Sequence, residues 1–107
     1  MFGGFGNIMK QAQVVQEKMK RVKEEIEKLE IEGQAGSGSV KVVISGRHIV
    51  RKVTIDPSLK DDDIDMIEDL VAAAFNDATT KLEAESKARM EKASAGLPLP
   101  KGIMDML

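Results

Sequence analysis

The chain lacks cysteine, tryptophan and tyrosine, and its 107 residues include only three phenylalanines and one histidine. Without cysteine, disulfide frameworks, thiol nucleophiles and cysteine-based zinc sites are excluded, which fits a reducing compartment such as the cytoplasm. With 3% aromatic residues, the core must be built from Ile, Val, Leu, Met and Ala. A domain of this size buries only about two-thirds of its unfolded surface, so association with a second copy would stabilise it.

Long apolar runs and a strong excess of basic charge are missing as well. No stretch approaches the roughly 18 apolar residues of a membrane-spanning helix, and residues 1–7 do not resemble a secretory signal, so we expect neither a membrane anchor nor export. The formal charge of -2 and the pI of about 5.4 argue against a histone-like polycation. Any nucleic-acid binding must therefore use local basic patches.

The residues for a catalytic or metal site are also too few. His48 stands beside Arg47 in an expected tight turn, with no cysteine or tyrosine to act with it. The acidic run 61–65 resembles the start of a calcium loop, but Met66 occupies the position that needs Gly and Ala72 the position that needs Glu. We therefore expect no enzyme, catalytic residue, metal, cofactor or small-molecule substrate.

What the chain does contain is a helical repeat near its N-terminus. Apolar residues spaced alternately by four and three predict a long helix with a heptad seam, capped by Asn7 after a flexible segment 1–7; the seam is Ile8, Ala12, Val15, Met19, Val22, Ile26 and Leu29. Such a helix is about 35 Å long, so part of it should project from the domain. The seam could pack on the protein's own sheet or on a second chain.

Three strands are predicted next, over residues 30–35, 39–45 and 49–55, because β-branched residues alternate with polar ones between glycine-containing turns. Connections this short imply an antiparallel meander. Within it, Val40, Val42 and Ile44 share one face, and Arg51, Val53 and Ile55 likewise share a face. The sheet should have one buried side.

A second long helix is predicted beyond Pro57, with acidic residues 61–65 around its first turn. Its broad apolar face should pack on the sheet and comprises Ile64, Ile67, Leu70, Val71, Ala74, Phe75, Ala78 and Leu82. From residue 83 to 92 charged pairs at i, i+4 replace apolar residues, so this part should extend into solvent or along a partner. Residues 94–107 are predicted to form a non-helical tail in which Met104 and Leu107 remain available for docking.

Charge is unevenly distributed along the sequence. Residues 1–28 and 29–52 each carry a net charge of +2, residues 53–80 carry -7, and residues 81–107 carry +1. The first helix, the strands and the outer part of the second helix are therefore locally positive.

The sequence resembles the YbaB/EbfC family of bacterial nucleoid-associated proteins over nearly its whole length. The resemblance rests on Met1-Phe2-Gly3, segments 9–13 and 16–19, Val40-Lys41-Val42, Gly46 with His48, segments 55–59 and 68–78, and Gly96, Leu99, Pro100 and Gly102. Lys101 stands where the family commonly has a second proline.

The resemblance implies a single α+β domain over residues 1–107, an α-β-β-β-α protomer with a three-stranded antiparallel meander. It also implies a tweezer-like homodimer formed through the central sheet, whose projecting helices bind duplex DNA in the cytoplasmic nucleoid and influence nucleoid organisation and gene expression. The DNA-binding candidates, chosen on these helices for charge and exposure, are Lys10, Lys18, Lys20, Arg21, Lys23, Lys87, Arg89 and Lys92.

Two functions follow from these expectations. In the first, lysines and arginines on two helices neutralise DNA phosphates, with modest sequence preference because no cluster of base-reading side chains stands at a helix N-terminus. In the second, a dimeric, coiled-coil-like adaptor binds replication or recombination proteins. A DNA complex should weaken steeply with salt, whereas a complex driven by apolar burial should not.

Overall fold

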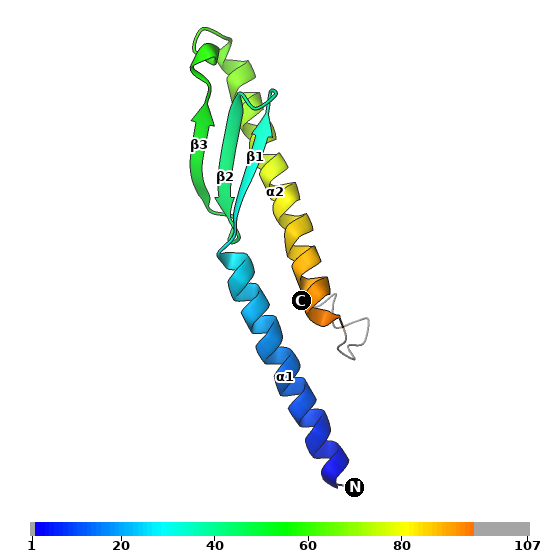
Figure 1. Ribbon diagram of the computed structural model, residues 1–107. Coiled ribbons are helices and arrows are strands. Elements are labelled where there is room, and N and C mark those ends of the chain that lie inside the picture. Colours follow the sequence, from blue (N-terminus) through cyan, green and yellow to red (C-terminus); the bar gives the residue numbers. More distant parts are fainter. Residues whose placement is uncertain (1, 96–107) are drawn as a thin grey trace.

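The structure is a computed structural model that describes residues 2–95, with side chains from residue 6 onward. Its elements follow the order α1 (Phe2–Glu27), β1 (Glu30–Ala35), β2 (Val40–Ser45), β3 (Val50–Ile55), a short 3₁₀ helix (Pro57–Leu59) and α2 (Ile64–Ser94) (Figure 1). This order confirms the predicted α+β protomer. None of its helices is long and apolar enough to cross a membrane, within the residues described.

The three strands form an antiparallel sheet in the order β1-β2-β3, as predicted. Ser45 anchors the connection between β2 and β3, because its buried hydroxyl oxygen accepts hydrogen bonds from the backbone N–H groups of Arg47 and Ile49, at 3.2 and 3.3 Å. His48 is exposed in this turn with a φ of 63°, which agrees with its predicted place. A register shift after Val43 then bends the β2–β3 pair.

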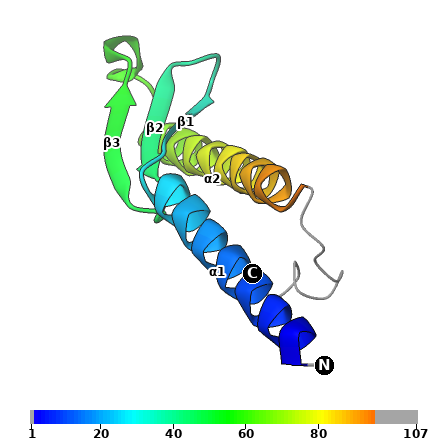
Figure 2. The same cartoon turned by 60° about the horizontal axis from the view of Figure 1, so that its bottom comes forward.

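The main core lies between the sheet and α2, which crosses one face of β1 and β2 (Figures 1 and 2). The predicted face of β2 is buried here against small and branched residues of α2; the buried residues are Val40, Val42, Ile44, Leu59, Ala74, Ala78 and Leu82. Gly33 of β1 lies so close to Ala74 and Ala78 that a Cβ at this position would overlap the α2 backbone. Small residues on both elements therefore allow the close approach.

The third strand, in contrast, is exposed along its whole length. Its apolar residues include Val50, Val53 and Ile55, which are between 42 and 46% exposed. Val53 pairs with Val42 and Ile55 with Val40, so this apolar surface continues the core face of the sheet beyond the edge of α2. The β3 part of the predicted buried side is thus uncovered in the protomer.

The first helix begins earlier than the sequence predicts. Residues 1–7 were expected to be flexible, with Asn7 as the N-cap, but α1 starts at Phe2 and places Asn7 inside the helix. Glycines in this segment are unfavourable for a helix, yet extending an existing helix costs far less than starting one. The strong repeat that follows therefore carries the helix back through them.

The second helix begins as the acidic residues suggest, although only part of the run belongs to it. Asp63 is the N-cap and accepts a hydrogen bond from the N–H of Asp65, while Asp61 and Asp62 precede the helix. The helix continues to Ser94, with Ala95 as its C-cap. Apart from these first two residues, the predicted tail 94–107 lies outside the described residues.

The protomer is strongly elongated, with extents of 75 × 21 × 17 Å. Its radius of gyration is 20.0 Å, whereas a compact chain of this length has about 13 Å. Both helices leave the sheet at the same end and form two arms (Figure 2). The projection of α1, predicted from its length, is confirmed.

The two arms pack on each other through a small second cluster. Met19 and Val22 of α1 are buried against Ala93 of α2, with Val15, Ile26 and Met90 at the margins. The middle of the heptad seam thus packs on α2 of the same chain and not on the sheet. The outer part of α2, expected in solvent or along a partner, lies against α1.

Candidate nucleic-acid interface

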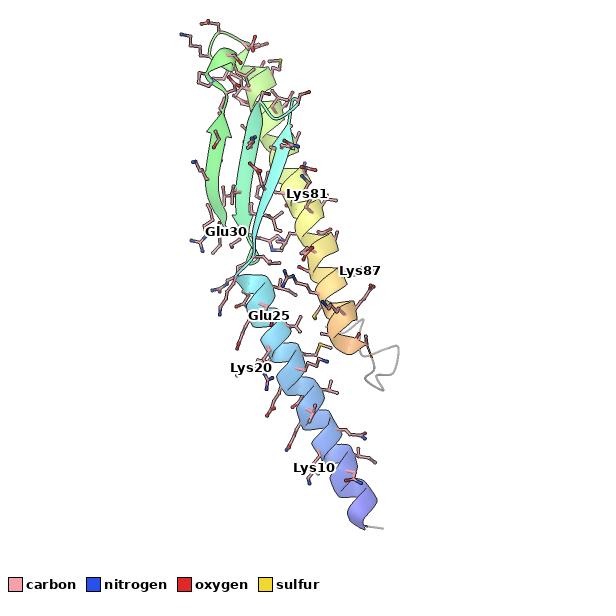
Figure 3. All side chains as sticks on the ribbon, viewed as in Figure 1. Lys10, Lys20, Glu25, Glu30, Lys81 and Lys87 are labelled. Carbon is pink, nitrogen blue, oxygen red and sulfur yellow. The ribbon has the colours of Figure 1, made fainter. Side chains whose placement is uncertain are left out.

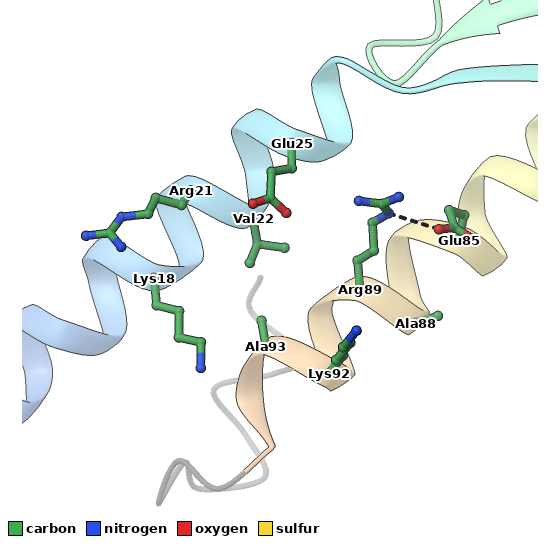
Figure 4. Close-up of a pocket in the computed structure, with 9 residues that line it drawn as sticks. All are labelled: Lys18, Arg21, Val22, Glu25, Glu85, Ala88, Arg89, Lys92 and Ala93. Atoms are coloured by element: carbon green, nitrogen blue, oxygen red, sulfur yellow. Dashed lines mark hydrogen bonds and ion pairs between the residues drawn. The ribbon is translucent and has the colours of Figure 1, made fainter.

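A cleft of about 620 Å³ opens between the two arms, beside their shared apolar cluster (Figure 4). Val22 and Ala93 form its apolar part. Its charged lining comes from both helices and consists of Lys18, Arg21, Glu25, Glu85, Arg89 and Lys92. Four of the eight predicted DNA-binding residues are therefore brought to one place.

The helical period places Lys18 and Arg21 at this cleft. Each lies within about a third of a turn of Val22, which packs between the helices, so both flank the packed seam on the same side. The Lys18 side chain extends towards α2, whereas the Arg21 guanidinium points outward along α1 (Figure 4). Arg21 also forms a weak, exposed ion pair with Glu17 at 3.9 Å. Lys18 is thus the better placed of the two for a ligand inside the cleft.

The opposite wall is built by Arg89 and Lys92, one turn apart on α2. Arg89 Nε donates a hydrogen bond to Glu85 Oε1 at 2.9 Å, one of the i, i+4 pairs expected from the sequence. This pair orients the guanidinium and leaves its two terminal nitrogens available for further acceptors. Lys92, in the last turn, also complements the negative end of the α2 dipole.

The balance of charge along the cleft is positive but modest. Four cationic side chains face two carboxylates, those of Glu25 and Glu85. Neither carboxylate was predicted as a site residue. The pairing of Glu85 with Arg89 was expected from their i, i+4 spacing, but the presence of Glu25 in the same cleft depends on how α1 packs on α2. The two carboxylates reduce the attraction for an anion without reversing its sign.

The other four predicted residues do not join this group. Lys20 projects from another side of α1, Lys10 lies beyond the end of α2, and Lys87 points away from α1 on the outer side of α2 (Figure 3). Lys23 does not line the cleft either. Their selection by charge and exposure alone did not distinguish the side of each helix that faces the second arm.

A second group of basic residues lies outside the cleft. Arg47, Arg51 and Lys52 are exposed on the β2–β3 turn and β3. None of the three lines the cleft, so they belong to the surface of the sheet.

A polar contact at Asp77 connects α2 to the sheet. The Asp77 carboxylate accepts hydrogen bonds from Lys81 Nζ and from the Gln34 backbone N–H, both at 2.9 Å. The bond from Lys81 and then that from Gln34 lower the pKa of Asp77. This contact ties the inner part of α2 to β1, from which its outer part extends as an arm.

Comparison with known proteins agrees with this arrangement. The crystal structure of an uncharacterized protein from Helicobacter pylori has a similar fold, with a TM-score of 0.62 over 82% of this chain and 90% of that chain, at 20% sequence identity. The sequence profile of the YbaB/EbfC DNA-binding family matches residues 1–97. This match covers the sheet and both arms, and the chain therefore belongs to the YbaB/EbfC DNA-binding family.

Proposed function

We propose that this protein binds duplex DNA as a homodimer through the cleft between its arms and so acts in the organisation of the nucleoid. Family membership supports the general role of a DNA-binding, nucleoid-associated protein. The observation that carries the finer proposal is the convergence of Lys18, Arg21, Arg89 and Lys92, from two separate helices, on one open cleft.

The mechanism is neutralisation of backbone phosphates. Lysine and arginine side chains replace condensed counterions, whose release supplies binding free energy without reading the bases. The cleft cations stand on the sides of long helices, and two carboxylates line the same cleft. We therefore propose weak, phosphate-directed binding with modest sequence preference, and an influence on gene expression that arises from coating DNA.

The uncovered strand β3 supports dimerisation. As an edge strand it has unpaired backbone groups on its outer side, and its apolar side chains continue the core face beyond α2. Pairing with a second copy would cover both features and would hold two sets of arms at a fixed separation. Each set could then touch the same duplex.

Two double variants with the same change in charge test the assignment. Lys18→Gln with Lys92→Gln removes one cation from each wall of the cleft, whereas Lys20→Gln with Lys87→Gln removes one from each helix outside it. Binding of duplex DNA should weaken for the first pair, whatever the DNA sequence. The slope of log affinity against log salt should also fall by about 0.9 for each lost contact. The second pair should retain most of the affinity and slope.

Equal losses of affinity for both pairs would contradict DNA binding in the cleft and favour general attraction of DNA to either helix. Circular dichroism and the mass of the assembly must be unchanged in both variants for the comparison to hold. If duplex DNA is bound without dependence on salt or on these cations, phosphate neutralisation is contradicted. If duplex DNA is not bound at all, the adaptor function with a protein partner becomes the better explanation.

A further inference from the structure

The heptad seam of α1 is only partly covered. From Val15 to Ile26 it packs on α2, but Ile8 is 64% exposed and Ala12 is exposed. This uncovered part lies on the same side of the helix, in line with Met19 and Val22. It begins where α2 ends, and α1 continues beyond that point (Figures 1 and 2).

The two halves of α1 also differ in charge. Residues 6–16 contain a single charged side chain, Lys10, whereas residues 17–28 contain nine. A surface with so little positive charge is poorly suited to phosphates, so the exposed seam is not explained by DNA binding. Its apolar residues, flanked by Gln11 and Gln16, fit an uncharged apolar partner.

Such a partner follows α2 in the same chain. Residues 96–107 are half apolar and carry one positive and one negative charge; their apolar side chains are Leu97, Leu99, Ile103, Met104, Met106 and Leu107. Pro98 and Pro100 disfavour continuation of the helix beyond Ala95. The segment follows an α2 end at which Ala93 packs against Met19 and Val22.

Its length is sufficient to reach the whole seam. Twelve extended residues span up to about 40 Å, whereas Ile8 and Val15 are separated by roughly 10 Å along the helix axis. The covalent attachment keeps the segment at a high effective concentration near its own α1, which favours it over the same segment of another molecule.

We propose that residues 97–107 dock on the N-terminal apolar seam of α1 in the same chain. The segment covers Ile8, Ala12 and Val15 and continues the contact that Met90 and Ala93 make with the later part of the seam. It thereby joins the ends of the two arms that bound the cleft.

Disulfide trapping tests this directly, because the chain contains no cysteine. Ala12→Cys is combined in the full-length protein with Met104→Cys or, separately, with Met106→Cys. The control places the first cysteine at Val14, which is 55% exposed on another side of α1. Under mild oxidation, at least one seam pair should close within a single chain about tenfold faster than its Val14 control, since docking raises the effective concentration of the two thiols.

Addition of Ile8→Gln to the faster pair should lower its rate to that of the control, because it removes the largest exposed side chain of the seam. Non-reducing gels and peptide mass spectrometry distinguish closure within a chain from linkage between chains. Equal rates for seam and control pairs, or no effect of Ile8→Gln, would overturn the proposal. Predominant linkage between chains would overturn it as well and assign the seam to a second copy.

Discussion

The two apolar clusters of the protomer differ in size and in surroundings. Among the described residues, seven are buried between the sheet and α2, but only Met19, Val22 and Ala93 are buried between the arms. The first cluster is enclosed by a sheet and a helix, whereas the second is bordered by an open cleft. Stability is therefore concentrated at the sheet, and the arms form a region that can adjust to a ligand.

The largest loss of stability is expected when α2 is separated from the sheet. Gly33→Val should lower the free energy of unfolding by about 3 kcal/mol or more, because its side chain would meet the α2 backbone at Ala74 and Ala78. Chemical denaturation measures the loss. Gln34→Val, at the neighbouring exposed position, is the control and should change stability little. A stable Gly33→Val protein would show that β1 and α2 are less tightly packed.

The same substitution in each cluster compares how much each one contributes to stability. Val42→Ala, in the sheet core, should cost about 2–3 kcal/mol, since it removes two buried methyl groups and leaves a cavity that the sheet cannot close. Val22→Ala, between the arms, should cost about 1 kcal/mol because the helices can close around the smaller residue. Denaturant titration of both variants checks the order. Equal losses would mean that the arms are as rigid as the core.

The charge of the cleft offers a smaller effect that concerns binding alone. Glu85→Gln removes a carboxylate that pairs with Arg89 and should tighten duplex binding about two- to threefold, in keeping with the small free energy of a partly exposed ion pair. Glu83→Gln makes the same change at an exposed position outside the cleft and should have less effect. Fluorescence anisotropy at fixed salt measures both, and equal gains would argue for net charge alone.

The smallest expected effect is a pH dependence at the inner part of α2. Because hydrogen bonds from Lys81 and Gln34 lower the pKa of Asp77, its contribution to stability is complete above the ordinary value of 3.8 and is lost as the pH falls through the lowered value. Asp77→Asn should thus be slightly destabilising at neutral pH and neutral in strong acid, measured by urea unfolding. An equal effect at both pH values would assign the loss to geometry and not to charge.

Most of the fold was predictable from local patterns. Strand positions followed from β-branched residues between turns, and the heptad seam identified α1, because these signals depend on neighbours in sequence. The predicted start of α1 was wrong because it also depended on neighbours in sequence. The glycines before Asn7 predict a flexible segment locally, whereas the helix is continuous from Phe2. Resemblance to the family supplied what patterns could not, the expectation that these helices bind DNA.

By itself, the sequence determined the order of elements, the apolar side of each and the absence of the residues needed for a thiol or cysteine-metal site. Only the tertiary structure decided which apolar sides meet: α2 covers β1 and β2 but not β3, and α1 packs on α2 over part of its seam. It also brought Lys18, Arg21, Arg89 and Lys92, four of the eight candidates, to one cleft. The physical reason is that periodicity defines a side of a helix, whereas its partner depends on segments far apart in the chain.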